Sequence, residues 1–325
     1  MGRLIVRYRQ AEIVRWGELT GPPPTTADAR LEVRPLAVAA GATADLIAAL
    51  QEAEIARGAA IEIAAGDLLS PVTSDAQLFA QGLNYQAHAA EAQHAKRTSN
   101  LIFAKASSSL TGPFSPIVRP PEVQLLDYEV EFGIVLRRDI GAGDVITDAT
   151  VGDYVAGVVL WNDVSARDTM FGTSFLQWFR GKSYRTFCPT GPALLLLEPA
   201  EVAEVLAKLD LKLWVNGELR QAATSGQLIW KPAETLTYIA SSIDLRRGDM
   251  VLTGTPGGVT APATPAMVEI LKTHLLADDV RRDALRVEMT KGRPFLKPGD
   301  VVTATLAELD GASLGGLANP VIDAA

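Results

Sequence analysis

The sequence predicts a mostly β fold with additional helices, in which a large domain follows a small α+β unit. Two observations predict the β-rich part. Asn216 and Gly217 separate two alternating, strand-like segments, and Asn-Gly supplies the two positive-φ positions of a tight hairpin turn. Two Gly-Asp turns, at Gly248 and Gly299, each lead into an apolar strand-like run. Such turns favour a barrel-like or rolled sheet over a parallel one.

Length and composition bound the class of protein. The chain has 325 residues, which allows a large domain with a small appendage. Apolar residues make up 48% and charged residues 21%, a balance that is ordinary for a folded protein and too apolar for disorder. The formal net charge is -8 and no run of Lys or Arg occurs, which argues against a nucleic-acid partner.

Cys188 is the single cysteine, which excludes an internal disulfide and any multi-cysteine metal site. We expect it in the core. The N-terminal segment lacks the long apolar stretch of a signal peptide, and no apolar run approaches the roughly 18 residues that span a bilayer. We therefore expect a cytoplasmic protein without a membrane partner.

Residues 1–75 have the pattern of a small N-terminal α+β domain. Short alternating segments near its start predict strands, and apolar residues at helical spacing from Leu46 to Ile55 predict a helix. Nothing there indicates chemistry. The main domain is then expected over residues 76–325.

The run from Asp127 to Leu136 is strand-like, yet it carries two carboxylates. Side chains alternate along a strand, so Glu129 and Glu131 share one face. A solvated polar face would explain them. The alternative is a bound cation, because two close carboxylates repel each other unless a cation or solvent lies between them. The strand by itself leaves both explanations open.

A second apolar run, at residues 155–161, predicts a buried strand that leads to Asp163. Asp163 is either the N-cap of a following helix or a functional carboxylate. Further along, Lys182 follows Gly181 in a predicted turn. This turn is not a P-loop, because Leu176 stands where the first glycine of that motif would fall.

His88 and Glu91 stand three residues apart in a short segment of helical pattern, a spacing that lets the two side chains meet. A surface pair is the alternative. The chain has two further histidines, His94 and His274, so an imidazole base has few candidates.

The order of these motifs resembles the fumarylacetoacetate hydrolase superfamily, in particular its bacterial acylpyruvate hydrolases, over roughly residues 79–323. The matching segments are residues 82–85 with His88 and Glu91, 126–131, 162–168, 181–183 with 186–189, and 253–259. Each is short, but they occur in the family's order and at similar separations. The resemblance implies a mixed β-sandwich roll for the catalytic domain. The helical pattern at 266–289 would then be an insertion.

The resemblance also implies a metal site made of Glu129, Glu131 and Asp163. Three carboxylate donors, with no Cys or clustered His, favour Mg²⁺ or Mn²⁺, with Ca²⁺ as a further option. Open coordination positions would bind a small 2-oxo acid through its carboxylate and keto oxygens. A homodimer is implied as well.

Residues that match substrate contacts of the family are Lys182, Arg167, Thr255, Gly254 and Tyr85. The first three would hold the acid end of the substrate. Met170 departs from the pattern, because long, eukaryotic-type members carry a polar substrate-contacting residue there. Fumarylacetoacetate itself is therefore not implied.

The implied reaction is hydrolysis of an acylpyruvate, such as maleylpyruvate or fumarylpyruvate, in the degradation of aromatic compounds. His88, oriented by Glu91, would deprotonate a water that attacks the distal carbonyl. The metal and Lys182 would stabilise the pyruvate enolate that leaves. Alternatives at the same site are oxaloacetate decarboxylation and isomerisation or hydration of an unsaturated 2-oxo acid. A non-catalytic 2-oxo-acid binding protein is a third.

Overall fold

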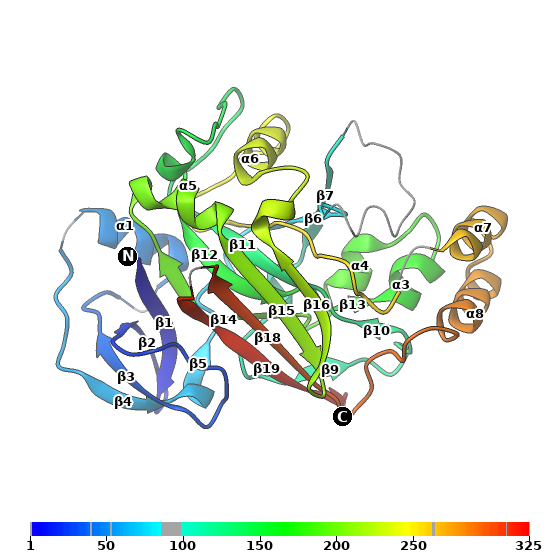
Figure 1. The fold of residues 1–325 in the computed structure, drawn as a ribbon, viewed down its shortest axis with the longest axis horizontal. Coiled ribbons are helices and arrows are strands. Elements are labelled where there is room, and N and C mark those ends of the chain that lie inside the picture. The colour runs from blue at the N-terminus through cyan, green and yellow to red at the C-terminus, as the bar shows by residue number, and fades with distance from the viewer. Residues whose placement is uncertain are drawn as a thin grey trace.

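The computed structural model describes residues 2–39, 41–52, 54–85, 99–261, 264–309 and 311–324. A 12-stranded sheet, a 5-stranded sheet, a small two-stranded sheet and several peripheral helices form a mixed α/β fold (Figure 1), which confirms the predicted class. Cys188 is buried, as predicted. No helix among the described residues is both long and apolar enough to cross a membrane.

The larger sheet has 12 strands. Its path runs through β4 (Ile61–Ala64), β3 (Arg30–Pro35), β2 (Ile13–Leu19), β1 (Arg3–Gln10), β14 (Cys188–Leu196), β12 (Val155–Asn162), β11 (Val130–Leu136), β17 (Met250–Leu252), β6 (Leu78–Gly82) and β7 (Leu101–Lys105). Off this path, β5 (Leu68–Leu69) pairs with β1 and β8 (Leu110–Thr111) pairs with β14.

The N-terminal strands extend this sheet. Strand β1 pairs antiparallel with β14, with Arg3 opposite Leu196. The predicted helix is α1 (Thr43–Glu52), whose Leu46 and Ile47 join a core cluster with residues of β11, β12 and β17. The predicted elements of this unit are therefore present, and its sheet is continuous with that of the main domain. The boundary at residue 75 stays a prediction.

The second sheet contains the predicted hairpin. Its order is β16 (Glu218–Thr224), β15 (Leu209–Val215), β18 (Val301–Glu308), β19 (Ser313–Asp323) and β9 (Ile117–Arg119). Asn216 and Gly217 form the β15–β16 turn at φ values of 51° and 81°. Apolar residues of β15 and β18 share one core cluster with residues of β11 and β12, so the two sheets pack face to face as a sandwich.

The acidic strand is shorter than predicted. Strand β10 (Leu126–Asp127) pairs with β13 (Ser165–Ala166), whereas β11 begins at Val130 and pairs with β12 and β17. Between them, the backbone N–H of Glu129 donates to the side-chain oxygen of Asn162 at 3.0 Å instead of to a ladder carbonyl. The chain therefore changes partner strands just where the first of the two glutamates lies.

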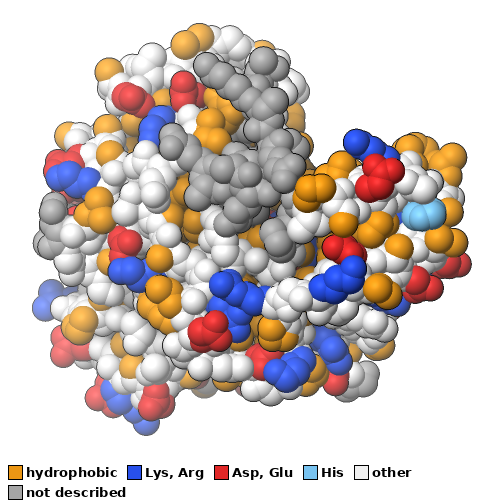
Figure 2. All heavy atoms as spheres, turned by 45° about the vertical axis from the view of Figure 1, so that its right-hand side comes forward, with side chains coloured by type: hydrophobic (Ala, Val, Ile, Leu, Met, Phe, Trp, Pro, Cys, Tyr) orange, Lys and Arg blue, Asp and Glu red, His pale blue; other side chains and the backbone are white. Residues whose placement is uncertain are grey.

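The helical pattern at residues 266–289 forms two helices, not one. They are α7 (Pro265–Thr273) and α8 (Asp278–Met289), and Figures 1 and 2 show the pair as a lobe that projects from the body. The fully buried Arg281 accounts for the break, because its guanidinium donates to the carbonyls of His274 at 3.3 Å and Leu275 at 2.6 Å. These contacts satisfy carbonyls that a continuous helix would have bonded internally.

Four more helices complete the described part of the fold, apart from single 3₁₀ turns. They are α3 (Arg167–Gly172), α4 (Trp178–Lys182), α5 (Pro199–Ala207) and α6 (Pro232–Ala240). Helix α8 packs on α3 at Gly172, where an added Cβ would lie 3.0 Å from Cγ of Arg282. Helices α3 and α4 lead away from β13 and carry two of the predicted site residues.

Candidate metal centre and active site

Three acidic side chains converge where β11 and β12 pair. Glu129, Glu131 and Asp163 each offer a carboxylate oxygen, and these oxygens lie within 4.8 Å of one another. Strand pairing brings them together, because Val130 lies opposite Asn162, and Glu129 and Asp163 are the residues just beyond this pair. The backbone N–H of Asp163 donates to the carbonyl of Glu129 at 2.8 Å. We call these three residues the carboxylate triad.

The positions of the three carboxylates exclude the two purely structural roles considered for them, a solvated strand face and a helix cap. Glu129 is 7%, Glu131 1% and Asp163 0% exposed, so the two glutamates do not form a solvated face. Asp163 does not cap a helix, since Ala166 occupies the N-cap position of α3. Buried carboxylates at such short separation require cations.

Two buried lysines bind the carboxylate triad directly. Nζ of Lys182, in α4, lies 2.8 Å from Oε2 of Glu129 and 2.6 Å from Oδ2 of Asp163. Nζ of Lys105, at the end of β7, contacts Oδ1 of Asp163 and donates to the carbonyl of Phe187 at 3.2 Å. Lys182 was predicted from the sequence, whereas Lys105 was not. A lone charge at the end of an apolar strand was the available signal.

Arg167 brings a third cation, held by Asp127. Its Nη2 lies 2.7 Å from Oε1 of Glu129 and 2.8 Å from Oδ2 of Asp127. Asp127 also accepts the backbone N–H groups of Thr260 at 2.9 Å and Ala261 at 3.1 Å. Asp127 was not predicted as a site residue, although it lies inside the matching 126–131 segment. It positions the guanidinium of Arg167 against Glu129.

Both Lys105 and Arg167 remain cations despite full burial. Burial by itself lowers the pKa of each group, but Asp163 raises the pKa of Lys105, and Asp127 and Glu129 raise that of Arg167, to above their ordinary values. With Lys182, the site holds three cations against the carboxylate triad and Asp127. If all these groups are ionised the net charge is -1, and a divalent ion would make it +1. A positive centre attracts an anionic ligand.

Among the described residues, Glu131 is the carboxylate of the triad without an ion-pair partner. Burial raises its pKa well above the usual range, repulsion from Asp163 and Glu129 raises it further, and Lys182 and the N–H of Gly254 oppose these effects. That N–H donates to Oε2 of Glu131 at 2.9 Å. Oε1 is buried and has no hydrogen-bond partner within the described ranges. A polar atom in this state is expected to bind a ligand.

The donor set of the carboxylate triad fits a hard divalent cation. It consists of carboxylates, with no Cys or His among the described residues joining it, and such oxygen donors hold Mg²⁺, Mn²⁺ or Ca²⁺. The unsatisfied oxygen of Glu131 supplies a ready ligand. Glu129, Glu131 and Asp163 would hold the ion, with Lys182 beside it.

The loop of residues 253–259 closes over Glu131. Gly254 adopts φ +90°, and an added Cβ would lie 2.9 Å from the carbonyl oxygen of Gln81, so the position requires glycine. The hydroxyl of Thr255 donates to the carbonyl of Val130 at 3.0 Å. In this structure Gly254 and Thr255 thus hold the strand that carries Glu131. Their role as substrate contacts stays a prediction, as does that of Arg167.

Gln221, on β16, is a further residue that the sequence analysis missed. Its Oε1 accepts the N–H of Val130 at 2.9 Å, and its Nε2 donates to Oγ1 of Thr255 at 2.8 Å and to the carbonyl of Pro256 at 2.9 Å. Val130 lies between the two glutamates of the triad. Gln221 therefore ties that peptide to the 253–259 loop, and nothing in its own strand pattern distinguishes it.

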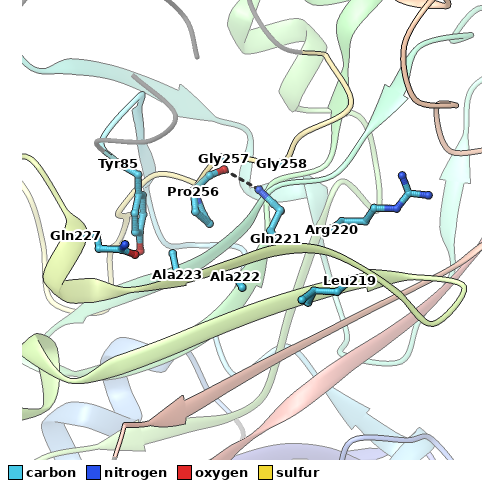
Figure 3. Close-up of a pocket in the computed structure, with 10 residues that line it drawn as sticks. All are labelled: Tyr85, Leu219, Arg220, Gln221, Ala222, Ala223, Gln227, Pro256, Gly257 and Gly258. Atoms are coloured by element: carbon cyan, nitrogen blue, oxygen red, sulfur yellow. Dashed lines mark hydrogen bonds between the residues drawn. The ribbon is translucent and has the colours of Figure 1, made fainter. Parts of the chain in front are cut away.

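Tyr85 lies in the wall of a cavity of about 540 Å³ beside this loop (Figure 3). Gln221 and residues 256–258 line the same cavity, with a wall of small residues from β16. Burial, followed by repulsion from Glu131, raises the pKa of the Tyr85 phenol. Its hydroxyl is buried without a hydrogen-bond partner in the described part of the chain, which is consistent with a ligand contact.

Two predicted catalytic residues, His88 and Glu91, lie outside the described residues. His274 follows the last residue of α7, as its C-cap. Met170 is 1% exposed, and its sulfur lies 3.8 Å from Nη1 of Arg167. An apolar side chain therefore lies beside the guanidinium of Arg167, at the position where the sequence departs from the family pattern.

Comparison with known proteins places the chain in a family. The model of the fumarylacetoacetate (FAA) hydrolase C-terminal domain matches residues 77–322. A 2,4-didehydro-3-deoxy-L-rhamnonate hydrolase from Sphingomonas sp. (strain SKA58) is 34% identical over 271 residues, which cover 82% of this chain and 89% of that enzyme. The segments that carry the resemblance therefore belong to a continuous match.

Two further similarities concern other reactions. A mitochondrial oxaloacetate tautomerase from Bos taurus is 38% identical over 191 residues, and the match covers 59% of this chain and 59% of that protein. The crystal structure of a probable 2-hydroxyhepta-2,4-diene-1,7-dioate isomerase from Mycobacterium abscessus superposes with a TM-score of 0.70 at 28% identity, and the match covers 100% of both chains. The chain belongs to the fumarylacetoacetate hydrolase family.

Proposed function

We propose that this protein acts on small 2-oxo acids at the carboxylate triad, and that its reaction is hydrolysis of a carbon–carbon bond in an acylpyruvate. Three buried carboxylates that converge on one point beside Lys182 carry this proposal. The similarity to the 2,4-didehydro-3-deoxy-L-rhamnonate hydrolase supports it, because that match covers 89% of the enzyme. The products would be pyruvate and a carboxylic acid.

Each residue around the carboxylate triad would have a separate role in binding and orienting the substrate. An ion held by Glu129, Glu131 and Asp163 would supply Lewis-acid chemistry to a bound 2-oxo acid. Lys182, which Glu129 and Asp163 hold in place, would donate to the keto oxygen as negative charge develops there. Asp127, through Arg167, keeps Glu129 in place.

The bond-breaking step would need a base, and we assign it to His88. His88, oriented by Glu91, takes a proton from water, and the hydroxide attacks the distal carbonyl carbon. The bond between that carbon and C3 of the pyruvate unit then breaks. The electron pair stays on the pyruvate unit as an enolate, which is protonated at C3.

A second candidate is tautomerisation of oxaloacetate or isomerisation of an unsaturated 2-oxo acid. The match to the oxaloacetate tautomerase, at 38% identity, favours it. These reactions move a proton at C3 and use no attacking water, and decarboxylation of oxaloacetate would pass through the same enolate. The cationic groups at the triad suit all of them.

The test is product formation by the Mn²⁺-loaded protein. We expect pyruvate release from a panel of acylpyruvates, followed with a coupled lactate dehydrogenase assay. Loss of enol absorbance from oxaloacetate without pyruvate release from any acylpyruvate would replace the hydrolase proposal with the tautomerase one. No metal-dependent turnover of either substrate type, with Mn²⁺ shown to be bound, would leave a 2-oxo-acid binding protein.

His88→Ala tests the base separately, with His274→Ala as its matched control. We expect kcat to fall by about 10² to 10⁴ in His88→Ala while Mn²⁺ stays bound. His274 caps α7, so its replacement should leave kcat unchanged. Equal activity of His88→Ala and wild type would place the base elsewhere.

A further inference from the structure

A second cavity lies where α8 packs against α3 and α4. Its volume is about 220 Å³, and none of the triad residues lines it. Three arginines do, namely Arg180, Arg282 and Arg286, together with Asp168 and Glu122. Two of these arginines come from α8, so the two-helix lobe builds part of the cavity.

The arginines of this cavity are incompletely neutralised. Nη2 of Arg286 lies 3.1 Å from Oδ2 of the buried Asp168, which balances its charge. Nη1 of Arg282 lies 3.2 Å from Asp279, whose side chain is 92% exposed, so water screens that pair. Arg180 is exposed, lies near Tyr184 and has no ion-pair partner within the described ranges. The lining thus sets three arginines against Asp168 and Glu122, a formal excess of one positive charge in a protein with a net charge of -8.

Two buried polar atoms of the lining have no hydrogen-bond partner among the described residues. They are Nε of Arg286, a donor, and Oδ1 of Asp168, an acceptor. Asp168 is 1% exposed, and its other oxygen already accepts the backbone N–H of Gln124 at 2.8 Å. Buried polar groups of this kind are normally bonded. A ligand that offers both an anionic oxygen and a hydroxyl would satisfy both atoms.

We propose that this cavity is a binding site for a phosphate group that carries a proton. The guanidinium groups would bind its anionic oxygens, and its hydroxyl would donate to Oδ1 of Asp168. The carboxylate makes the site selective, because an oxyanion without a proton would place two negative oxygens against each other. Inorganic phosphate keeps a proton at neutral pH, and a phosphate monoester shares this chemistry as its monoanion, below its second pKa of about 6.

The site is independent of the proposed reaction but is built on the same helix as one of its residues. Asp168 directly follows Arg167, whose guanidinium contacts Glu129 of the carboxylate triad. The assignment gives the α7–α8 lobe a role that the sequence alone left open. Anion binding to the metal-free protein tests the phosphate site, and this test does not depend on which substrate the protein acts on.

Calorimetry on the full-length protein tests the site. Chelation removes metal ions first, so that phosphate cannot bind through one. We expect saturable binding of inorganic phosphate with one site per chain, and binding of sulfate at least about tenfold weaker, because sulfate carries no proton near neutral pH. A third titration with methyl phosphate, at a pH below the second pKa of about 6 where the ester still carries a proton, shows whether the site takes free phosphate or accepts an ester as well.

The location of the site is tested with charge-matched variants. Arg180→Gln/Arg282→Gln should weaken phosphate binding about tenfold or more, the loss expected when charge-assisted hydrogen bonds are removed. Lys272→Gln/Lys291→Gln removes two charges from exposed lysines of the same lobe and should change nothing. Thermal melts establish that both variants fold.

Asp168→Asn probes the selectivity directly. The amide can donate a hydrogen bond, so sulfate should bind this variant about as well as phosphate does. Absence of saturable phosphate binding to the wild type would overturn the proposal. So would equal affinities for sulfate and phosphate in the wild type, or an unchanged phosphate affinity in Arg180→Gln/Arg282→Gln.

Discussion

Nζ of Lys182 lies 2.6 Å from Oδ2 of Asp163. The same ammonium group lies 2.8 Å from Oε2 of Glu129, so Lys182 bridges two of the three carboxylates of the triad. Its positive charge opposes a divalent ion there, yet it places a hydrogen-bond donor beside any substrate that such an ion would bind. Metal affinity and catalysis should therefore respond in opposite directions when this charge is removed.

We predict that Lys182→Met binds Mn²⁺ more tightly than the wild type, because the carboxylate triad loses a neighbouring cation. We also predict that kcat falls by about 10² to 10³, since a donor to the developing negative charge is lost. Calorimetric titration gives the first quantity and turnover at saturating Mn²⁺ the second. Lys212→Met, at a surface lysine paired with Asp210, should change neither. Weaker Mn²⁺ binding with normal kcat would contradict this role of Lys182.

Gln221 should act on the metal through the backbone of β11. Gln221→Leu leaves the buried N–H of Val130 without its acceptor and frees the hydroxyl of Thr255 from its donor. We expect Mn²⁺ affinity to fall about 10- to 100-fold, as when an outer-shell partner is lost. Gln221→Glu keeps the acceptor for Val130, so it should recover part of the affinity. Identical affinities in both variants and the wild type would show that Gln221 does not position the triad.

The buried pair of Asp127 and Arg167 should contribute far more to folding than an exposed pair. Asp127→Ala leaves a buried guanidinium with one partner fewer, and we expect a loss of about 3 to 5 kcal/mol in the free energy of unfolding. Asp323→Ala removes the partner of Arg119 in an exposed pair and should cost about 0 to 1 kcal/mol. Urea denaturation of the two variants measures both, and similar losses would be the contrary result.

Metal binding should depend on pH through Glu131. Its pKa is raised in the folded, metal-free protein, chiefly by burial and then by Asp163 and Glu129. Below that raised pKa an ion must displace a proton, so Mn²⁺ affinity should increase with pH and level off once Glu131 is ionised. Stability of the metal-free protein should change the other way. The folded form holds a proton that the unfolded form releases, so stability falls as pH rises from the ordinary pKa of Glu through the raised value.

The hairpin turn and the carboxylate triad could be predicted from short stretches of the sequence. Asn216 and Gly217 form the hairpin turn because their backbone conformations require no distant partner. The carboxylate triad was predicted from short motifs in a fixed order, and the pairing of β11 with β12 supplies the geometry that those motifs imply. In each case the signal and the structure it predicts lie within a few residues or between adjacent strands.

The remaining parts depend on contacts that are distant in the sequence. Lys105 binds Asp163 across 58 residues, and Gln221 binds Val130 across 91. The contact of Gln221 leaves no pattern in its own strand, and that of Lys105 leaves only a lone charge at the end of an apolar strand. The break between α7 and α8 likewise depends on the buried guanidinium of Arg281, which a helical periodicity does not reveal. The interruption before β11 arises because the chain exchanges one partner strand for another.

A calorimetric titration of Mn²⁺ into Glu131→Gln, compared with the wild type, tests the carboxylate triad most directly. The amide keeps the size of the side chain and removes its charge, so the fold should be preserved. We predict that affinity drops by more than about 100-fold, beyond the loss that outer-shell changes produce, and that its dependence on pH disappears. Binding with wild-type affinity would show that Glu131 is not a ligand and would contradict the proposed metal centre.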